Sequence, residues 1–163
     1  MTNGMLIEFG GLPGTGKSTL AGHLAERSGA VWLRIDEIEG AMRRNGLTAA
    51  QTGVTAYSVA HDLAASHLRR GLTVIADAVN PVAAARLGWR DLARSVRARH
   101  VVIETSCPER DRLARIARRE PDALVPLPAD AYQPRADDRL LVDTTRPLAD
   151  CQADVVRHAR IVA

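Results

Sequence analysis

The sequence is poor in the residues on which several protein classes depend. Aromatic side chains make up only 3% of it and are scattered, so no platform for stacking bases is evident. Its two cysteines, Cys107 and Cys151, are too few for a disulfide framework or a four-ligand zinc site, and we expect both to be buried and free. The five histidines have no metal-ligand spacing. These shortages argue against a base-stacking module, a disulfide scaffold and a zinc protein.

Long apolar runs are also missing. No stretch approaches the roughly 20 residues that span a bilayer. The first ten residues have no basic start and are interrupted by Glu8, unlike a secretion signal. We therefore expect a cytoplasmic protein with no membrane partner. The length of 163 residues suits a single domain, residues 1–163, as a monomer or a homodimer.

Lysine is the rarest charged residue. Of the 22 basic side chains only Lys17 is a lysine, and the arginines are spread along the chain without forming a block. The net charge of +3 is therefore a weak sign of nucleic acid, and we expect none as a partner. The single lysine falls inside the most specific motif of the sequence.

Strands and helices alternate along the chain. Apolar strands are predicted at 6–9, 31–35, 72–76, 100–104 and 139–143. Helical spacing and stop signals predict helices at 17–27, between 36 and 46, at about 49–70, and at 81–97, 108–120 and 147–162. This alternation predicts an α/β fold of three layers, in which a five-stranded parallel sheet has helices on both faces.

A glycine-rich loop joins the first strand to the first helix. Residues 11–18 fit the Walker A pattern G-x-x-x-x-G-K-[ST] between a strand and a helix, as its mechanism requires. Glycines allow backbone N–H groups to face phosphate oxygens, and the helix N-terminus adds partial positive charge. The residues predicted to bind ATP here are Gly11, Pro13, Gly14, Thr15, Gly16, Lys17, Ser18 and Thr19.

Three side chains are candidates for phosphate and metal chemistry. Lys17 is expected to reach the β and γ phosphates as a compact charge, a task for which arginine is no equivalent. Ser18 is expected to give its hydroxyl to Mg²⁺. Asp77 follows an apolar strand, as the Walker B carboxylate does, and is the second predicted metal residue.

Two polar residues at strand ends each allow two interpretations. Asp36 follows the second strand, at an edge where groups face the ligand crevice, and is a candidate base for the acceptor hydroxyl. The alternative is a helix cap, with Glu39 returning to the backbone as in a capping box. Asn80, before Pro81, is most simply the N-cap of the next helix, and substrate contact is the alternative.

An arginine-rich helix precedes a stretch with four prolines. Arg112, Arg115 and Arg119 recur at helical spacing and are candidates to neutralise charge on the phosphoryl group. Arg115 is the catalytic candidate and Arg112 an ATP ligand. The alternative is a solvated helix face paired with nearby carboxylates. Residues 120–138 are predicted to be loop, and we interpret the region of about 108–138 as a lid that moves on substrate binding.

Together these motifs resemble the small predicted kinases of the P-loop superfamily, some described as AAA-type ATPases. Their relatives include gluconate kinases, zeta toxins, chloramphenicol phosphotransferases and polynucleotide kinases. The resemblance spans nearly the whole chain and rests on the glycine loop, Arg-Ile-Asp at 34–36, Val-Ile-Ala-Asp-Ala-Val-Asn-Pro at 74–81, the arginine-rich helix, and Val-Asp-Thr-Thr-Arg-Pro-Leu at 142–148.

The resemblance implies a sheet of order 2-3-1-4-5, ATP as donor with Mg²⁺, and a lid arginine over the phosphates. It also implies that the acidic residue after the second strand faces the acceptor, and that Thr144, Thr145 and Arg146 lie near adenine. One position departs from the pattern, because polynucleotide kinases carry an arginine three residues after that acidic residue, where this sequence has Glu39.

The expected function is transfer of the γ-phosphate of ATP to a hydroxyl of a small acceptor that is uncharged or basic. The alternatives are a regulatory or switch-type ATPase without such an acceptor and, third, a polynucleotide 5′-kinase. Fold and donor site are shared by kinases of many substrates.

Overall fold

The computed structural model describes residues 3–119 and 127–160. Part of the predicted lid, residues 120–126, and the end of the predicted last helix lie outside the described residues. The strands are β1 Met5–Gly10, β2 Val31–Arg34, β3 Thr73–Asp77, β4 Arg99–Ser106 and β5 Leu140–Asp143. The helices are α1 Lys17–Ser28, α2 Ile35–Arg44, α3 Ala49–Leu68, α4 Ala83–Ser95, α5 Glu109–Arg119 and α6 Leu148–Ala159, with a 3₁₀ turn at Ala129–Ala131.

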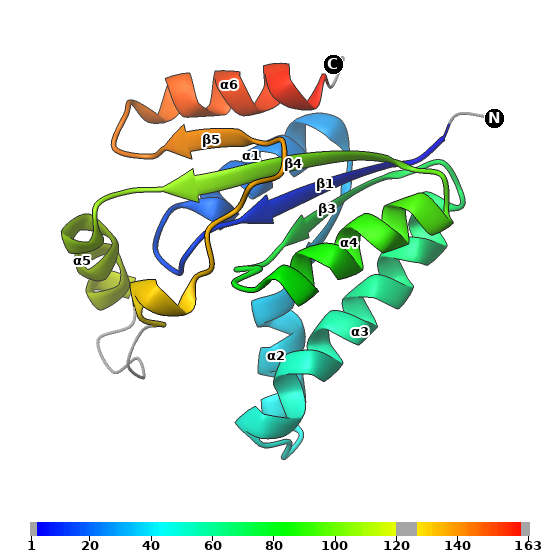
Figure 1. Ribbon diagram of the computed structural model, residues 1–163, viewed down its shortest axis with the longest axis horizontal. Helices are drawn as coiled ribbons and strands as arrows, with labels where there is room; N and C mark the ends of the chain where they lie inside the picture. The colour runs from blue at the N-terminus through cyan, green and yellow to red at the C-terminus, as the bar shows by residue number, and fades with distance from the viewer. Residues whose placement is uncertain (1–2, 120–126, 161–163) are drawn as a thin grey trace.

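The five strands form one parallel sheet in the order β2-β3-β1-β4-β5. This confirms the predicted topology. Helices α1 and α6 cover one face of the sheet, and α3 and α4 cover the other (Figure 1). Helix α5 lies beyond the carboxyl ends of the strands, which all point to the same edge. The fold therefore places the loops after β1, β2 and β3 at one edge, where ligands of such sheets bind.

Strand β1 separates two hydrophobic cores because successive side chains point to opposite faces. Ile7 and Phe9 pack with Leu24 of α1 and Val155 of α6, whereas Leu6 joins the core beneath α3 and α4. All of these side chains are fully buried. Burial on both faces accounts for the nearly continuous apolar strands in the sequence.

The loop after β3 differs from the prediction. Helix α4 begins at Ala83 with Val82 as its N-cap, so the prediction that Asn80 caps this helix is wrong. Asn80 is fully buried with a left-handed φ of 51°. Its side chain donates to the Phe9 carbonyl at 2.9 Å and accepts from Trp89 Nε1 at 3.0 Å. Hydrogen bonds from Asn80 to β1 and α4 thus fix its position, and local sequence spacing does not reveal them.

A buried ion-pair network lies beside the start of the glycine loop. Arg135 and Glu8 have fully buried side chains and form an ion pair at 2.8 Å. Arg135 also pairs with Asp137, and Glu8 contacts His100 Nε2 at 2.9 Å. Tyr132, three residues before Arg135, donates to a carboxylate of β4. The described end of the predicted lid is therefore anchored to the sheet through residues 132–137, and lid movement stays a prediction.

Within the ranges 3–119 and 127–160, no helix has the length and apolar character needed to cross a membrane.

Cys151 is buried and Cys107 is half-buried, and both thiols are free as predicted.

Candidate active site

The glycine loop between β1 and α1 adopts a conformation that side chains would prevent. Gly11, Gly14 and Gly16 have φ values of 133°, 83° and 92°, a region that favours glycine. A Cβ atom on Gly11 would lie 2.5 Å from the carbonyl oxygen of Thr105, and one on Gly14 would lie 2.7 Å from that of Arg112. The loop is thus packed from β4 and α5, which fixes its shape.

Helix α1 offers its N-terminus at the end of this loop. Its N-cap is Gly16, and the described residues provide no side-chain hydrogen bond to cap it. The first N–H groups of the helix are therefore free to bind an anion, and the helix dipole favours one there. Thr15 stabilises the turn, because its hydroxyl donates to the Leu12 carbonyl and shares a 2.7 Å contact with Thr105 Oγ1.

Lys17 is the first residue of α1 and is 8% exposed. Its Nζ donates to the Leu12 carbonyl at 3.0 Å, so the ammonium lies folded over the loop. Burial lowers its pKa to about 8, while the nearby carboxylates Asp77 and Asp36 act in the opposite direction. A buried ammonium with few polar partners is stabilised strongly when an anion binds beside it.

Ser18 and Asp77 meet as the Walker A and Walker B interpretation requires. The Ser18 hydroxyl donates to Asp77 Oδ2 at 2.8 Å, and Trp32 Nε1 donates to the same oxygen at 3.2 Å. Burial raises the pKa of Asp77, and the Ser18 hydrogen bond counteracts this. A hydroxyl and a carboxylate side by side are oxygen donors of the kind that Mg²⁺ prefers.

No cluster of three or more His, Cys, Asp or Glu suited to a metal occurs among the described residues. A Mg²⁺ ion here would therefore depend on oxygens from phosphate and water in addition to Ser18 and Asp77. Such shared coordination is the usual arrangement for Mg²⁺ with nucleotides. The residues thus fit a metal that arrives with a nucleotide.

The arginines of α5 contact the glycine loop through its carbonyl groups. Arg112 is 2% exposed and donates to the Pro13 carbonyl at 3.4 Å. Arg115 donates to the Gly14 carbonyl at 3.4 Å, and to the hydroxyl and the carbonyl of Thr144 at 2.9 Å each. Arg112 also lies 3.5 Å from Glu109 Oε1, a carboxylate pairing that the solvated-face alternative predicted, but its side chain is buried and that of Arg115 is half-buried, so neither forms a solvated face. Contact of either one with phosphate stays a prediction.

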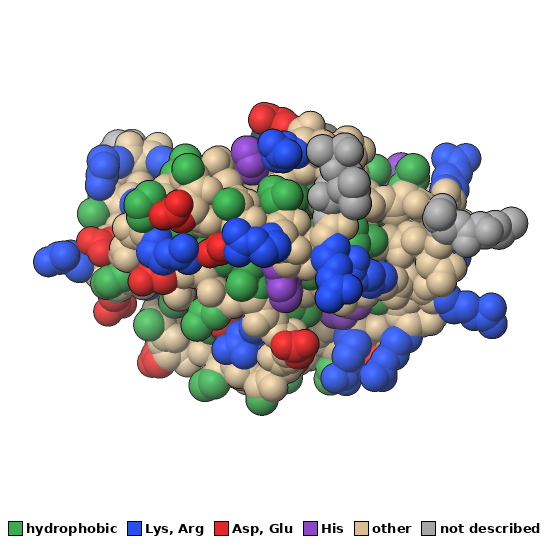
Figure 2. All heavy atoms as spheres, turned by 90° about the horizontal axis from the view of Figure 1, so that it is seen from above, with side chains coloured by type: hydrophobic (Ala, Val, Ile, Leu, Met, Phe, Trp, Pro, Cys, Tyr) green, Lys and Arg blue, Asp and Glu red, His purple; other side chains and the backbone are tan. Residues whose placement is uncertain are grey.

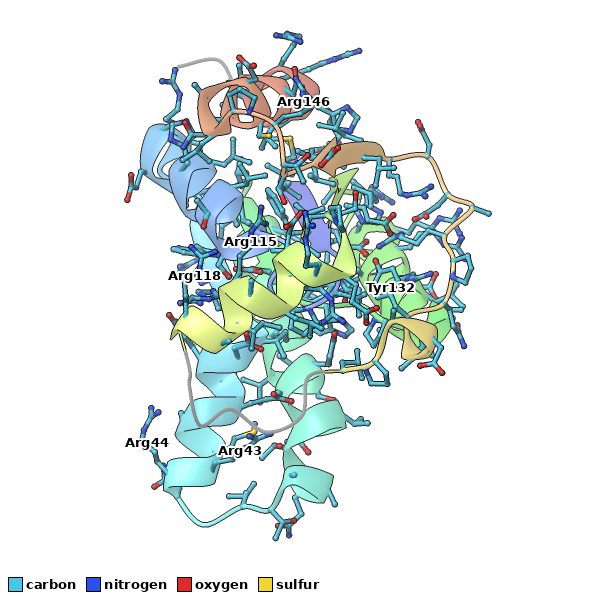
Figure 3. The ribbon with its side chains drawn as sticks, turned by 90° about the vertical axis from the view of Figure 1, so that its left-hand side faces the viewer. Arg43, Arg44, Arg115, Arg118, Tyr132 and Arg146 are labelled. Carbon is cyan, nitrogen blue, oxygen red and sulfur yellow. The ribbon has the colours of Figure 1, made fainter. Side chains whose placement is uncertain are left out.

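A pocket of about 350 Å³ opens beside the loop between α1, α5 and the start of α6. Figure 3 labels three of the arginines that line it, with Arg115 and Arg118 on α5 and Arg146 above them. Its lining residues are Gly14, Gly16, Thr19, Leu20, Arg115, Arg118, Arg119, Thr144, Arg146, Leu148 and Cys151. Its position next to the loop suits the base and ribose of a nucleotide. A second hollow of about 680 Å³ lies at the opposite end of β4, away from the loop.

The segment after β5 meets this pocket through Thr144 and Arg146. Thr144 donates to the Thr15 carbonyl at 2.8 Å, so it also braces the loop. Thr145 is exposed and its hydroxyl and N–H bind the Asp143 carboxylate. Among the described residues, Thr145 is absent from the pocket lining. The family resemblance implied that residues 144–146 lie near adenine, which stays a prediction, and it did not identify the bracing role of Thr144.

Asp36 is the second residue of α2 and is exposed. The N-cap of α2 is Arg34, and no side-chain cap hydrogen bond is present in the described structure. The capping interpretation of Asp36 is therefore wrong. Glu39 lies one turn further along α2, and its pKa is raised by partial burial. Arg34 itself, which the sequence did not single out, contacts the Ser18–Asp77 pair.

Comparison with known proteins agrees with this architecture. The sequence profile of the AAA domain family matches residues 6–135. No curated protein sequence matches the chain. The APS kinase CysC of Mycobacterium tuberculosis, solved with AMPPNP and APS, is 18% identical with a TM-score of 0.78, and the match covers 98% of this chain and 99% of that one.

Two further solved structures have the same fold. A gluconokinase from Sinorhizobium meliloti 1021 is 17% identical with a TM-score of 0.69, covering 98% of this chain and 94% of that one. Kti12 of Chaetomium thermophilum, solved with ADP-AlF3, is 14% identical with a TM-score of 0.73, covering 97% and 99%. With its profile match over most of its length and its glycine loop, Lys17 and Asp77 placed as described, this chain belongs to the AAA domain family and has the architecture of the small P-loop kinases.

Proposed function

We propose that this protein transfers the γ-phosphate of ATP, with Mg²⁺, to a hydroxyl group of a small-molecule acceptor. The observation that carries the proposal is the Ser18–Asp77 hydrogen bond at the carboxyl edge of the sheet, beside Lys17 at the start of α1. Burial lowers the pKa of Lys17, and Asp77 and Asp36 both act to raise it. A donor site and a free carboxylate at one edge are what phosphoryl transfer requires, since its catalysis is mostly positioning and charge stabilisation.

On the donor side, the glycine loop, Lys17 and the start of α1 bind the phosphates, and the neighbouring pocket takes the nucleoside. Ser18 and Asp77 hold the Mg²⁺ ion, which when bound neutralises charge on the phosphate oxygens. Arg115, which contacts the Gly14 carbonyl, and Arg119, whose charge acts on Lys17, are the candidates to stabilise negative charge on the transferred group.

On the acceptor side, Asp36 is the base that receives the hydroxyl proton. Glu39 is on the same helix, and burial raises the pKa of Tyr57 to about 12, with Glu39, Glu8 and Asp36 adding to the effect. Tyr57 therefore keeps its proton at neutral pH and stays a hydrogen-bond donor. Position 39, three residues after Asp36, is a glutamate where polynucleotide kinases carry an arginine. Two carboxylates at this place favour an acceptor that is uncharged or basic.

The test is a screen of hydroxyl compounds with ATP and Mg²⁺, read by the appearance of a phosphorylated product. Sugars, hydroxyl-bearing antibiotics, nucleosides and a 5′-hydroxyl oligonucleotide form the panel. A phosphorylated small molecule, lost in Lys17→Ala, supports the proposal. ADP and inorganic phosphate without a phosphorylated acceptor would favour the switch-type ATPase instead.

Phosphorylation of the oligonucleotide would favour the polynucleotide 5′-kinase. Against that alternative, arginine side chains on the face that carries α6 are scattered among acidic ones (Figure 2). A nucleic-acid groove is expected to be a continuous basic stripe. We therefore place nucleic acid behind a small acceptor.

A further inference from the structure

Arg34 contacts the two oxygens that are suited to the metal. It is the last residue of β2, and its Nη2 lies 3.4 Å from Ser18 Oγ, while its Nε lies 3.7 Å from Asp77 Oδ2. Its Nη1 makes a closer bond, at 2.8 Å, to Glu37 Oε1. The guanidinium also lies over the ring of Trp32, with its carbon 5.1 Å from the ring centre.

These contacts differ in quality. The bond to Glu37 has good hydrogen-bond geometry, whereas the approaches to Ser18 and Asp77 are long. Arg34 Nε is buried and has no hydrogen-bond partner among residues 3–119 and 127–160. The guanidinium therefore supplies positive charge to the buried Asp77 carboxylate without binding it firmly. Its hydrogen-bonded carboxylate partner is Glu37.

We propose that Arg34 is a displaceable counter-ion of the metal site, which a Mg²⁺ ion at Ser18 and Asp77 drives away from these two residues while its bond to Glu37 is kept. The inference rests on the proposed MgATP site. Two cations beside the same two oxygens repel each other, and Lys17 continues to supply positive charge to the buried Asp77 carboxylate when Arg34 moves away. Glu37 is exposed and already bound to Arg34, so the arginine keeps a partner when it moves.

The position of Arg34 in the chain gives this exchange a consequence. Arg34 is the N-cap residue of α2, and Asp36 follows two residues later. The Arg34 side chain bonds Glu37, which adjoins Asp36 in the first turn of α2, so its displacement from the metal site acts on the turn that carries the proposed base. Arg34 is in this sense a positioning residue, which links occupation of the donor site to the geometry of the acceptor site.

Trp32 provides a direct readout. It contacts both Arg34 and Asp77, whereas the other tryptophan, Trp89 of α4, is fully buried in the core beneath α3 and α4 and bonded to Asn80. Titration of Mg²⁺ into protein saturated with ADP is expected to change tryptophan fluorescence. The change is expected to be absent from Trp32→Phe and absent when Mg²⁺ is replaced by EDTA.

The decisive variant is Arg34→Gln, with Arg44→Gln at the exposed far end of α2 as the matched control (Figure 3). Removal of the competing charge is expected to lower the Mg²⁺ concentration at half-saturation by about three- to tenfold, while Arg44→Gln leaves it unchanged. The melting temperature of each variant checks its folding. Two results would overturn the inference. One is Mg²⁺ binding that is unchanged or weaker in folded Arg34→Gln, and the other is tryptophan fluorescence of the wild-type protein that does not change with Mg²⁺. Failure of ADP to bind the wild-type protein would instead contradict the proposed function.

Discussion

The hydroxyl of Ser18 donates a hydrogen bond of 2.8 Å to Asp77 Oδ2 and so joins the first turn of α1 to the end of β3. These residues are 59 positions apart in the chain. Parallel pairing of β1 with β3 brings them together, because it aligns Phe9, just before the glycine loop, with Asp77. The two residues predicted to hold the metal are therefore already arranged around one point.

Asp77→Asn is expected to weaken the Mg²⁺-dependent part of nucleotide binding by roughly 10- to 100-fold. The amide keeps the size of the side chain and its ability to accept from Ser18, but it removes the charge that the metal requires. Thermal shifts with ADP in Mg²⁺ and in EDTA separate the two contributions. Asp91→Asn, on the exposed face of α4, is the control. An equal Mg²⁺ effect in all three proteins would remove Asp77 from the metal site.

Nucleotide affinity is expected to depend on pH through Lys17. Burial lowers its pKa from 10.5 to about 8, and phosphate binding requires the charged form. Affinity should thus be level below pH 8 and fall above it, by at most about tenfold per pH unit. Binding near pH 8 should take up protons, which calorimetry in two buffers of different ionisation enthalpy detects.

The lowered pKa of Lys17 also makes the stability of the nucleotide-free protein depend on pH. Because the unfolded chain keeps the higher pKa, it binds more protons between pH 8 and 10.5, so this group favours folding increasingly as pH rises through that window. Lys17→Arg stays charged throughout but is no equivalent at the phosphates, so it is expected to bind nucleotide more weakly and without this pH dependence. A level affinity from pH 7 to 10 in the wild-type protein would contradict the assignment.

Local sequence signals were enough for the strands of a parallel sheet and for the glycine loop, whereas the strand order came from the family resemblance. Apolar strands that alternate with helices, and a Walker A pattern between a strand and a helix, do not depend on distant residues. The roles of Asp36 and Asn80 were harder to predict. A capping pattern is also a local signal, but tertiary contacts can override it. At Asn80, buried bonds to Phe9 and Trp89 outweighed the capping signal, and no spacing rule identifies such partners.

Asp36→Asn is expected to leave ATP affinity within a few fold of wild type and to lower phosphoryl transfer by roughly two to four orders of magnitude. The amide cannot accept the proton of the acceptor hydroxyl. Stability should change little, since Asp36 is exposed and does not cap α2. Nucleotide affinity, melting temperature and turnover on one identified acceptor are the measurements, with Asp91→Asn again as control. Turnover close to wild type would exclude Asp36 as the base.

Arg135→Met is expected to destabilise the protein by about 3–5 kcal/mol, because it leaves the fully buried Glu8 carboxylate without its cation. The double variant Glu8→Leu with Arg135→Met should recover a large part of that loss. Arg110→Met, at a side chain that is 90% exposed, should change stability by less than about 0.5 kcal/mol. Urea unfolding midpoints provide the comparison. Equal midpoints for Arg135→Met and Arg110→Met would show that the ion pair does not anchor residues 132–137.

Arg135 is also where sequence reasoning fell short, since proline-rich spacing predicted only loop for this segment. The ion pair joins residues 127 positions apart, and an arginine in a loop has no local mark of burial. A charged Glu8 within the apolar β1 was the available signal, because a carboxylate in a central strand needs a cationic partner.

The most direct test is calorimetric titration of ATP, with Mg²⁺ in excess, into the wild-type protein and Lys17→Ala at pH 7. The account predicts saturable binding of one ATP per chain to the wild-type protein and a loss of at least about tenfold in affinity in the folded variant, because Lys17 is the cation at the glycine loop. Absence of binding by the wild-type protein at millimolar ATP, or equal affinity in the two proteins, would contradict it.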